Sequence, residues 1–359
     1  MTTASGITVL SGATLFDIRP WLDYDGPAKR SRTILLGSDD LQAQMRKIVH
    51  YATLAASSHN SQPWKFTVKQ KTIEVHPDYS RRLPVVDPND RELWMSLGCA
   101  LENLIIGASA TGFSCHVTYP DSADYIAVSL TDDTAVSSAL VDAIALRQNT
   151  RSAYDGKKVP SKDVDQLQSI PLEPGIGLSW ILDDSVLKTT ADYVGQGNLI
   201  QWADHAFVDE LISWLRFNKR EALDTYDGLF TSCSGNPVLP GWLGRLFVSK
   251  TKPSNQSEAD VSKLLGSSGA VVITSSTSED RTQWVRTGQV YERLALKMTS
   301  LNIKSALLNQ PIETTSLRPQ LQSALGLGKS AAELLLRFGY AASTPVSLRR
   351  PVEQVLFEA

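Results

Sequence analysis

A polar loop at residues 57–64 holds the side chains best suited to hydrogen bonding with a ligand. It reads Ser57-Ser58-His59-Asn60-Ser61-Gln62-Pro63-Trp64. Its hydroxyls, amides and imidazole can donate and accept several hydrogen bonds, and Pro63 holds the segment open between a helix and a strand. Such a loop can surround a planar heterocycle, although the same side chains could also satisfy only the loop's own backbone.

Two compact clusters that combine arginines with hydroxyl or amide residues could bind a phosphate group. One is Arg147-Gln148-Asn149-Thr150-Arg151, and the other is Ser347-Leu348-Arg349-Arg350 near the C-terminus. Guanidinium groups can engage phosphate oxygens with two hydrogen bonds at once. Either cluster alone would more often be a solvated face or a surface ion pair. Their occurrence together with the polar loop favours a binding site.

The remaining residues show no other catalytic or metal-binding pattern. His59 is the only histidine in the candidate site, and it suits a hydrogen-bonding role at least as well as general acid work. The other histidines lack metal-ligand spacing; they are His50, His76, His116 and His205. The three cysteines, at 99, 115 and 233, are expected to be reduced, buried thiols. We therefore expect neither a metal nor a catalytic side chain.

The composition bounds the class of protein. With 359 residues, of which 42% are hydrophobic, the chain exceeds the usual length of one domain and can bury a sizeable core. Its net charge of -3 arises from 35 basic and 38 acidic residues that are interspersed. This balance favours neither a nucleic acid nor a membrane surface as a partner. The N-terminus lacks the basic and apolar regions of a signal peptide, and so we expect a cytoplasmic protein.

One sequence pattern occurs twice, at an offset of 190 residues from Asp90 to Asp280. The first copy is Asp90-Arg91, Trp94, Gly98, Glu102 and Leu104; the second is Asp280-Arg281, Trp284, Gly288, Glu292 and Leu294. Apolar residues at helical spacing predict one long helix in each copy. An internal duplication would reproduce a two-fold symmetric dimer within one chain. We expect the two helices to face each other as a spine, with the repeated tryptophans and glycines in packing contacts.

The remaining periodicity predicts alternating helices and short strands. Helices are expected at 40–56, 135–146, 161–168, 184–200 and 206–223. Strands are expected at 64–69, 72–76, 114–119, 270–274 and 334–338. Residues 224–255 are rich in Gly and Pro, which predicts a loop-rich stretch that could act as a lid.

Together these features resemble the nitroreductase family of flavin proteins, and in particular its Acg-like branch, in which two nitroreductase modules are fused. The resemblance runs from about residue 40 to the C-terminus. It rests on SSHNSQPW at 57–64, the helix at 90–112, RQNTRSAY at 147–154, LLNQPIE at 307–313 and RFGYAASTPVSLRRPVEQVL at 337–356. It implies an α+β fold with a mainly antiparallel sheet in each module and helices around a helical spine.

The resemblance also implies that FMN lies between the two modules. The first module would place Ser57, Ser58, Asn60 and Gln62 beside the flavin. The second would bind the phosphate through Arg147, Asn149, Arg151, Arg349 and Arg350, and would pass the isoalloxazine ring at Asn309, Gln310 and Ile312.

Three positions concern the finer chemistry of this implied site. Lys263 resembles the family's lysine near the flavin pyrimidine, where a positive charge stabilises reduced anionic flavin. Asn149 stands where Ser or Thr is usual, and Ser347 stands where classical members often have Lys. We therefore expect weaker affinity for the phosphate.

The implied activity is that of an FMN-dependent NAD(P)H oxidoreductase. NADPH or NADH would give hydride to flavin N5, and a small organic acceptor would then take the electrons in a ping-pong reaction. A non-enzymatic flavin-binding or flavin-storage protein is an alternative, and so is a biosynthetic flavin oxidase or dehydrogenase.

The arrangement of the flavin elements also predicts the organisation of the chain. Only one complete set of them is present, which predicts one FMN per chain and a monomer with internal pseudo-two-fold symmetry. We expect an N-terminal extension or arm at 1–40, a first module at 41–146, and a second module at 147–359 that includes the lid at 224–255.

Overall fold

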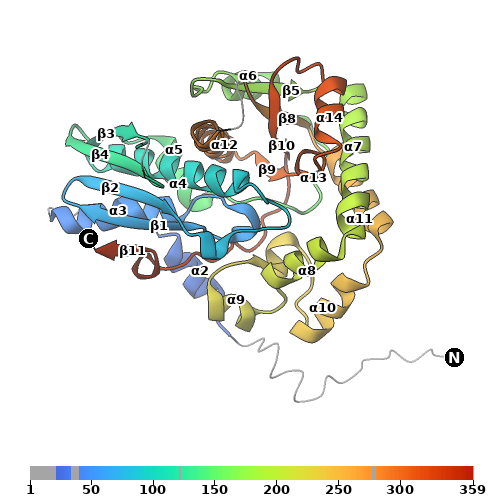
Figure 1. The fold of residues 1–359 in the computed structure, drawn as a ribbon, viewed down its shortest axis with the longest axis horizontal. Helices are drawn as coiled ribbons and strands as arrows, with labels where there is room; N and C mark the ends of the chain where they lie inside the picture. Colours follow the sequence, from blue (N-terminus) through green and yellow to red (C-terminus); the bar gives the residue numbers. More distant parts are fainter. Residues whose placement is uncertain (1–21, 34–39, 121–122, 277–279, 359) are drawn as a thin grey trace.

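The computed structural model describes residues 22–33, 40–120, 123–276 and 280–358. Its first sheet has the strand order β11-β1-β2-β4-β3 (Figure 1). The strands are β1 Trp64–Lys69, β2 Thr72–Pro77, β3 Phe113–Thr118, β4 Ile126–Asp132 and β11 Leu356–Glu358. Neighbouring strands are antiparallel except β1 and β11, which are parallel. The C-terminal strand thus returns to the sheet that the early part of the chain forms.

The second sheet is antiparallel throughout and has the order β5-β8-β10-β9. Its strands are β5 Ile176–Ile181, β8 Gly269–Ser275, β9 Lys304–Leu307 and β10 Ala331–Gly339. Every residue of β8 is buried, as its apolar run predicts. A separate parallel pair is formed by β6 Leu215–Arg216 and β7 Leu229–Phe230. The expected α+β class with mainly antiparallel sheets is confirmed.

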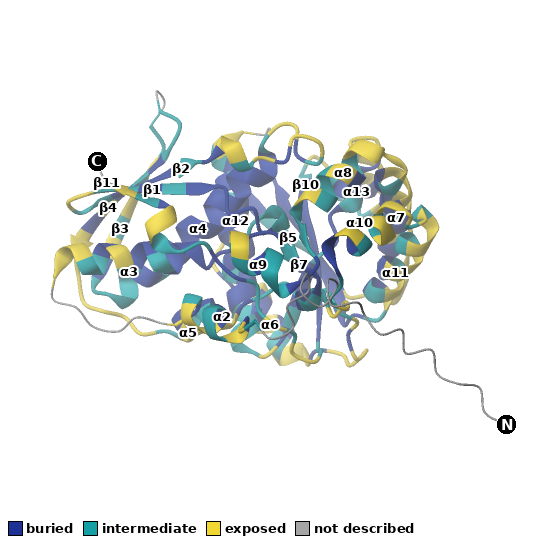
Figure 2. Cartoon of the chain, turned by 90° about the horizontal axis from the view of Figure 1, so that it is seen from below, coloured by how far each residue is buried: buried dark blue, intermediate teal, exposed yellow. Residues whose placement is uncertain are grey.

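Two long helices, α4 Arg91–Ala110 and α12 Arg281–Ser300, pack against each other between the sheets (Figures 1 and 2). Their closest approach is at the repeated glycines. A Cβ atom on Gly98 would lie 2.0 Å from the carbonyl oxygen of Val285, and one on Gly288 would lie 1.9 Å from that of Met95. Only glycine allows such close contact of two helix backbones. The expected pair of facing helices is confirmed.

The two helices begin differently although their sequences match. The Asp280 side chain accepts a hydrogen bond from the backbone N–H of Gln283 at 2.8 Å, as an N-cap does. Asp90 instead has a left-handed backbone with φ 58° and makes no such cap. The Asp87 carboxylate accepts from the N–H of Leu93 at 2.9 Å in its place.

The other helices surround the spine and the sheets (Figure 1). They are α2 Asp25–Ser31, α3 Leu41–Thr53, α5 Ala139–Leu146, α6 Ser161–Gln168, α7 Asp184–Ala203, α8 His205–Trp214, α9 Lys219–Thr225, α10 Gly241–Ser249, α11 Pro253–Leu265, α13 Gln310–Glu313 and α14 Arg318–Ala324. Short 3₁₀ segments lie at Ser58–Asn60, Tyr79–Arg81, Thr231–Ser234 and Val352–Gln354. Helices α7 and α11 pack side by side beyond the second sheet.

The expectation of one helix over 206–223 is wrong. The chain leaves α8 after Trp214, runs extended through β6, and starts again as α9. The Asn218 side chain caps α9 by accepting from the N–H of Glu221 at 3.0 Å, which marks a new helix start. The stretch 224–255 also contains the helix α10, and so it is less loop-rich than expected.

Among the described residues, α4 is the one helix whose length and apolar composition would suit a membrane span. Most of that span is buried inside the protein. Packing against α12 and α3 accounts for its apolar composition.

Candidate functional site

The polar loop at 57–62 adopts a backbone that few residues adopt. His59, Asn60 and Gln62 all have positive φ angles, of 51°, 54° and 53°. Each left-handed non-glycine residue costs free energy, and such residues gather where a loop must present groups in a fixed direction. Gly228 and Asn60 hold the loop to a distant segment: the Gly228 N–H donates to Asn60 O at 3.2 Å, and Asn60 Nδ2 donates to Gly228 O at 3.0 Å.

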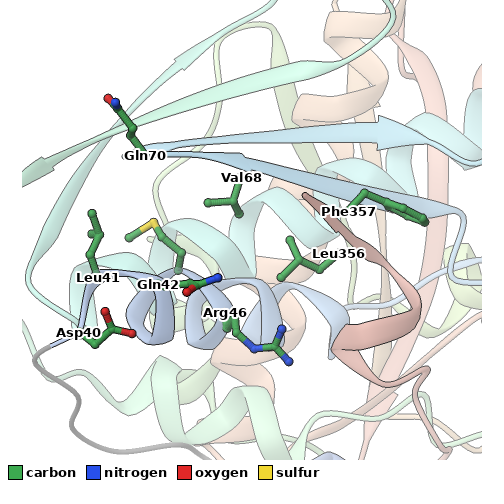
Figure 3. Close-up of a pocket in the computed structure, with 9 residues that line it drawn as sticks. Asp40, Leu41, Gln42, Arg46, Val68, Gln70, Leu356 and Phe357 are labelled. Carbon is green, nitrogen blue, oxygen red and sulfur yellow. The ribbon is translucent and has the colours of Figure 1, made fainter. Parts of the chain in front are cut away.

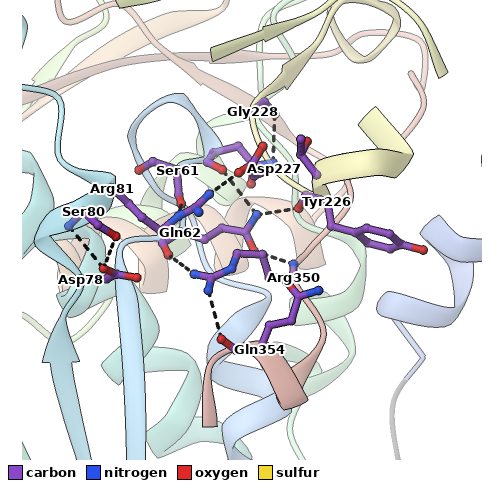
Figure 4. A network of polar contacts seen from close by, with 12 residues as sticks. Ser61, Gln62, Asp78, Ser80, Arg81, Tyr226, Asp227, Gly228, Arg350 and Gln354 are labelled. Carbon is purple, nitrogen blue, oxygen red and sulfur yellow. Dashed lines mark hydrogen bonds and ion pairs between the residues drawn. The ribbon is translucent and has the colours of Figure 1, made fainter. Parts of the chain in front are cut away.

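Gln62 is fully buried and joins three segments (Figure 4). Its Nε2 donates to the carbonyl of Tyr226 at 2.9 Å. Its Oε1 accepts from the backbone N–H of Arg350 at 2.8 Å, and its own carbonyl accepts from the Arg350 guanidinium at 3.3 Å. The Ser57 hydroxyl accepts from the N–H of Gln62 at 3.0 Å. Ser57, Gln62 and Arg350 are therefore brought together, and the amide of Gln62 is already engaged within the protein.

A buried carboxylate at the start of α4 connects two more predicted residues. The Ser58 hydroxyl donates to the Glu92 carboxylate, and Asn309 Nδ2 donates to the other oxygen of that carboxylate at 3.3 Å. Asn309 Oδ1 accepts from the N–H of Leu335 at 2.9 Å, which ties it to β10. Glu92 thus joins the polar loop to the segment predicted to pass the flavin ring.

Gln310 and Lys263 meet at a second carboxylate. Gln310 Nε2 lies 3.0 Å from one oxygen of Asp260, and Lys263 Nζ lies 2.9 Å from the other. Gln310 Oε1 is buried without a hydrogen-bond partner among the described residues. Ile312 is 2% exposed and belongs to the core around α7 and β10. The charge of Lys263 is therefore matched by a neighbour on its own helix, and Ile312 has a packing role.

The first arginine cluster reaches the spine helix α12. Arg147 Nε lies 2.8 Å from Glu292 Oε1, with both side chains buried, and Arg147 Nη2 donates to Leu54 O at 3.2 Å. Asn149 Oδ1 accepts from the Tyr291 hydroxyl at 2.8 Å. Burial raises the pKa of Glu292, and the neighbouring Arg147 charge opposes that shift.

Arg151 differs from these residues because its guanidinium has no hydrogen-bond or ion-pair partner among the residues that the structure describes. Burial lowers its pKa. It lies near His59, whose pKa is lowered to about 4 by burial and by the Arg151 charge. The charge of Arg151 thus acts on the polar loop through His59, an imidazole that is neutral at pH 7.

The second arginine cluster lies at the C-terminal end of α3. Arg349 is 5% exposed, and its Nη2 donates to Ala55 O at 3.1 Å. Its Nε is buried without a hydrogen-bond partner among the described residues. Burial, and then the charges of Arg32 and Arg147, lower the pKa of Arg349 well below its usual value. A groove of about 340 Å³ runs beside Arg349, Arg350 and Tyr226.

The donor set around these arginines fits a phosphate group. The guanidiniums of Arg32, Arg147 and Arg349 are buried and repel one another. Glu292 is the carboxylate whose negative charge acts on all three of them. Buried charges without counter-ions are costly. The unpartnered Nε of Arg349 and the available guanidinium of Arg151 would both gain from an added anion.

Sequence reasoning missed several residues that organise this site. Glu92 and Asp260 gave no signal, since a single acidic residue in a helix is common. Glu292 stood out only as part of the repeat. Arg32 lay in a basic segment whose role the sequence did not indicate. Within the described residues, no group of three His, Cys, Asp or Glu is placed to hold a metal ion.

A second groove, of about 440 Å³, lies between α3 and the strands β1 and β11 (Figure 3). Met45 is among the residues that line it. Val68, Gln70, Leu356 and Phe357 also line it (Figure 3). None of the predicted flavin residues lines it. The candidate site is therefore a different part of the molecule.

Comparison with known proteins finds relatives along most of the chain. No protein-family model matches the chain. The chain is 26% identical over 337 residues to the Mycobacterium tuberculosis protein named "Putative NAD(P)H nitroreductase Rv3131", covering 87% of this chain and 90% of the relative. It is 23% identical to "Putative NAD(P)H nitroreductase acg" of the same organism, covering 87% and 94% of the two chains. Over most of its length the chain is therefore similar to proteins that are named NAD(P)H nitroreductases.

The similarity to the Acg protein agrees with the expected resemblance to the Acg-like branch. A solved structure, a nitroreductase with bound FMN from Bacteroides fragilis, is 16% identical to this chain, with a TM-score of 0.36. The match covers 57% of this chain and 90% of that structure's chain.

Proposed function

We propose that the protein is an FMN-dependent oxidoreductase of the nitroreductase type that uses NADPH or NADH as donor and a small organic molecule as acceptor. One observation carries the proposal: buried arginines from two distant segments, Arg147 and Arg349, converge with too few carboxylates to balance them. The family relationship supports FMN as the phosphate-bearing partner, since relatives are named NAD(P)H nitroreductases.

The proposed cofactor site joins both arginine clusters to the polar loop. Arg147, Arg151 and Arg349 would bind the phosphate, with Asn149 beside them. Ser57, Ser58, Asn60 and Gln62 would surround the ring from one side, and Asn309 and Gln310 would do so from the other. Bound FMN would supply the redox chemistry, by accepting hydride from the nicotinamide and passing electrons to the acceptor in a ping-pong reaction.

The chain's own residues would then bind the FMN, orient its ring and shield it from water. The loop at 58–62, with left-handed residues at 59, 60 and 62, holds its polar groups in place because Gln62 and Asn60 are fastened to the segment at 226–228. His59 is neutral at pH 7, so a proton from its imidazolium is not part of the proposed reaction. Lys263 is paired with Asp260, and its proposed role near the pyrimidine would require that pair to rearrange.

The test is the absorbance spectrum of the purified protein under anaerobic conditions, before and after NADPH or NADH is added. We expect a flavin spectrum that bleaches with the donor and returns when an organic acceptor such as a quinone or nitroarene is added. A flavin spectrum that neither donor bleaches would favour flavin storage. Bleaching only with an organic reductant other than a nicotinamide would favour a biosynthetic flavin dehydrogenase. A protein that binds no flavin would contradict the proposal.

The number of FMN sites per chain follows from the single set of flavin-binding segments. We propose one FMN per chain and a monomer, with a first module at 41–146, a second at 147–359 and a lid at 224–255. Residues 22–33 of the proposed N-terminal arm are described, whereas 1–21 and 34–39 lie outside the described residues. Flavin released on denaturation, measured against protein mass, tests the stoichiometry: two FMN per chain would exclude a single site. Sedimentation tests the monomer.

A further inference from the structure

The N-terminal segment at 22–33 packs over both arginine clusters. The Tyr24 hydroxyl donates to Val346 O at 2.8 Å, next to the C-terminal cluster. Tyr24, which precedes α2, and Ala28, within α2, are buried together with Phe230 and Leu348. Figure 1 shows α2 between α3 and α9, against the body of the protein. The segment therefore has a defined docking place, and its last buried residue is Arg32.

The Arg32 side chain contacts the backbone of both predicted phosphate segments. It is 6% exposed. Its Nη1 donates to Arg147 O at 2.9 Å and to Ala145 O at 3.1 Å, and its Nη2 donates to Ser347 O at 3.4 Å. These bonds connect the N-terminal segment to the start of the 147–151 cluster and to the start of the 347–350 cluster.

The third nitrogen of Arg32, Nε, is buried and has no hydrogen-bond partner among the described residues. A buried N–H of a charged group that lacks an acceptor costs more than the same group exposed to water. Arg349, on a different segment, has the same feature at its own Nε.

The charges around Arg32 leave a deficit of anions. The charge of Arg147 acts on Arg32, and the charges of Arg32 and Arg147 act on Arg349, while the nearby carboxylate, Glu292, already pairs with Arg147. Burial, and then the Arg147 charge, lower the pKa of Arg32 to about 10, so the group is still charged at pH 7. Three positive charges against one negative leave an excess that a phosphate monoester, with close to two negative charges at pH 7, would neutralise.

We propose that Arg32 belongs to the phosphate-binding site, so that binding of a phosphate monoester and docking of the segment at 22–33 stabilise each other. The identity of that monoester as FMN rests on the proposed function. Binding and docking are linked in both directions: an anion that favours the docked segment must bind more weakly when the segment cannot contribute Arg32. Riboflavin, which lacks the phosphate, should not be coupled to the segment.

The first experiment measures affinity with the full-length chain. Arg32→Met keeps much of the side chain's length and removes its charge, and Lys29→Ala removes an exposed charge from the same segment. We expect Arg32→Met to weaken FMN binding about thirtyfold, the scale of a lost hydrogen bond to a charged group, while riboflavin binding changes less than about fivefold. Lys29→Ala should leave both affinities within a factor of about two, as an exposed group does.

The second experiment uses the wild-type protein and so does not depend on a variant that folds. Hydrogen exchange at the amides of 24–33 is measured with no addition, with riboflavin, with inorganic phosphate and with FMN. We expect FMN and inorganic phosphate to slow exchange at Ala28 and Arg32, whose N–H groups bond within this segment, and riboflavin to leave it unchanged.

The outcomes separate this inference from the proposed function. Slower exchange with inorganic phosphate, in a protein that binds no flavin, would support the anion site and overturn the proposed function. Tight FMN binding with equal exchange in FMN and riboflavin would overturn the coupling and leave the proposed function intact. If Arg32→Met leaves the ratio of FMN affinity to riboflavin affinity unchanged, the proposed role of Arg32 in phosphate binding is also overturned.

Discussion

Arg147 and Glu292 form a buried ion pair, with 2.8 Å between Nε and Oε1, that joins the residues after α5 to the middle of α12. The corresponding residue of the other spine helix, Glu102, pairs with Arg293 at 2.7 Å. Arg293 is less buried than Arg147 and has a second carboxylate, Glu173, at 2.8 Å.

This difference predicts unequal costs for two matched substitutions. Glu292→Gln leaves Arg147 buried without a counter-charge, and we expect the free energy of unfolding to fall by about 3 kcal/mol or more. Glu102→Gln should cost clearly less, since Arg293 keeps Glu173. Urea unfolding of both variants in the absence of flavin measures the difference. Equal losses would show that the Arg147 pair has no special role.

The glycines at the spine crossing predict a steric effect. Gly98→Ala would place a Cβ 2.0 Å from Val285 O, so the helices must separate. We expect a loss of about 2 kcal/mol or more from overpacking, against a gain of only about 1 kcal/mol from the better helix propensity of alanine. Gly266→Ala, where the nearest atom is 3.3 Å away, is the control and should change stability by less than about 1 kcal/mol. If thermal unfolding shows that the two variants lose the same stability, the close packing at Gly98 is contradicted.

Arg349 is predicted to distinguish FMN from riboflavin. If it binds the phosphate, Arg349→Ala should cost roughly 2 kcal/mol of FMN binding, or about thirtyfold in affinity, with a much smaller effect on riboflavin. Arg46→Ala is the control, because its exposed pair with Glu353 should contribute little to either affinity. Fluorescence titration measures all four affinities. Equal losses for both flavins would indicate structural damage, since Arg349 also holds the carbonyl of Ala55.

His59 predicts a dependence of stability on pH. Its folded-state pKa of about 4 lies below the ordinary value of 6.5, so the unfolded chain binds the proton first as the pH falls. Stability should therefore decrease between about pH 6.5 and pH 4, by on the order of 2 kcal/mol from this group.

His59→Asn tests this because asparagine tolerates the left-handed backbone found there. The variant should lose less stability than the wild type between pH 7 and pH 4.5 in urea unfolding, whereas His116→Asn, at an exposed position of β3, should match the wild type. A His59→Asn curve parallel to that of the wild type would contradict the prediction.

Local sequence was enough to predict the spine helices, because their apolar spacing depends only on neighbours along the chain. It also predicted β1, β2 and the buried strand β8 nearly to the residue. The residue types in the polar loop and in the two arginine clusters indicated the chemistry of a phosphorylated heterocycle.

The tertiary structure alone decided which of those groups meet and what they leave unpaired. The return of β11 to β1, the pairing of Arg147 with Glu292 and the burial of Arg32 join residues that are far apart in sequence. No periodicity reports such contacts, since they arise when packed elements exclude water and each buried charge must find a partner. The break between α8 and α9 has a similar cause: helix propensity favoured continuation, but pairing of β6 with β7 and the Asn218 cap outweighed it.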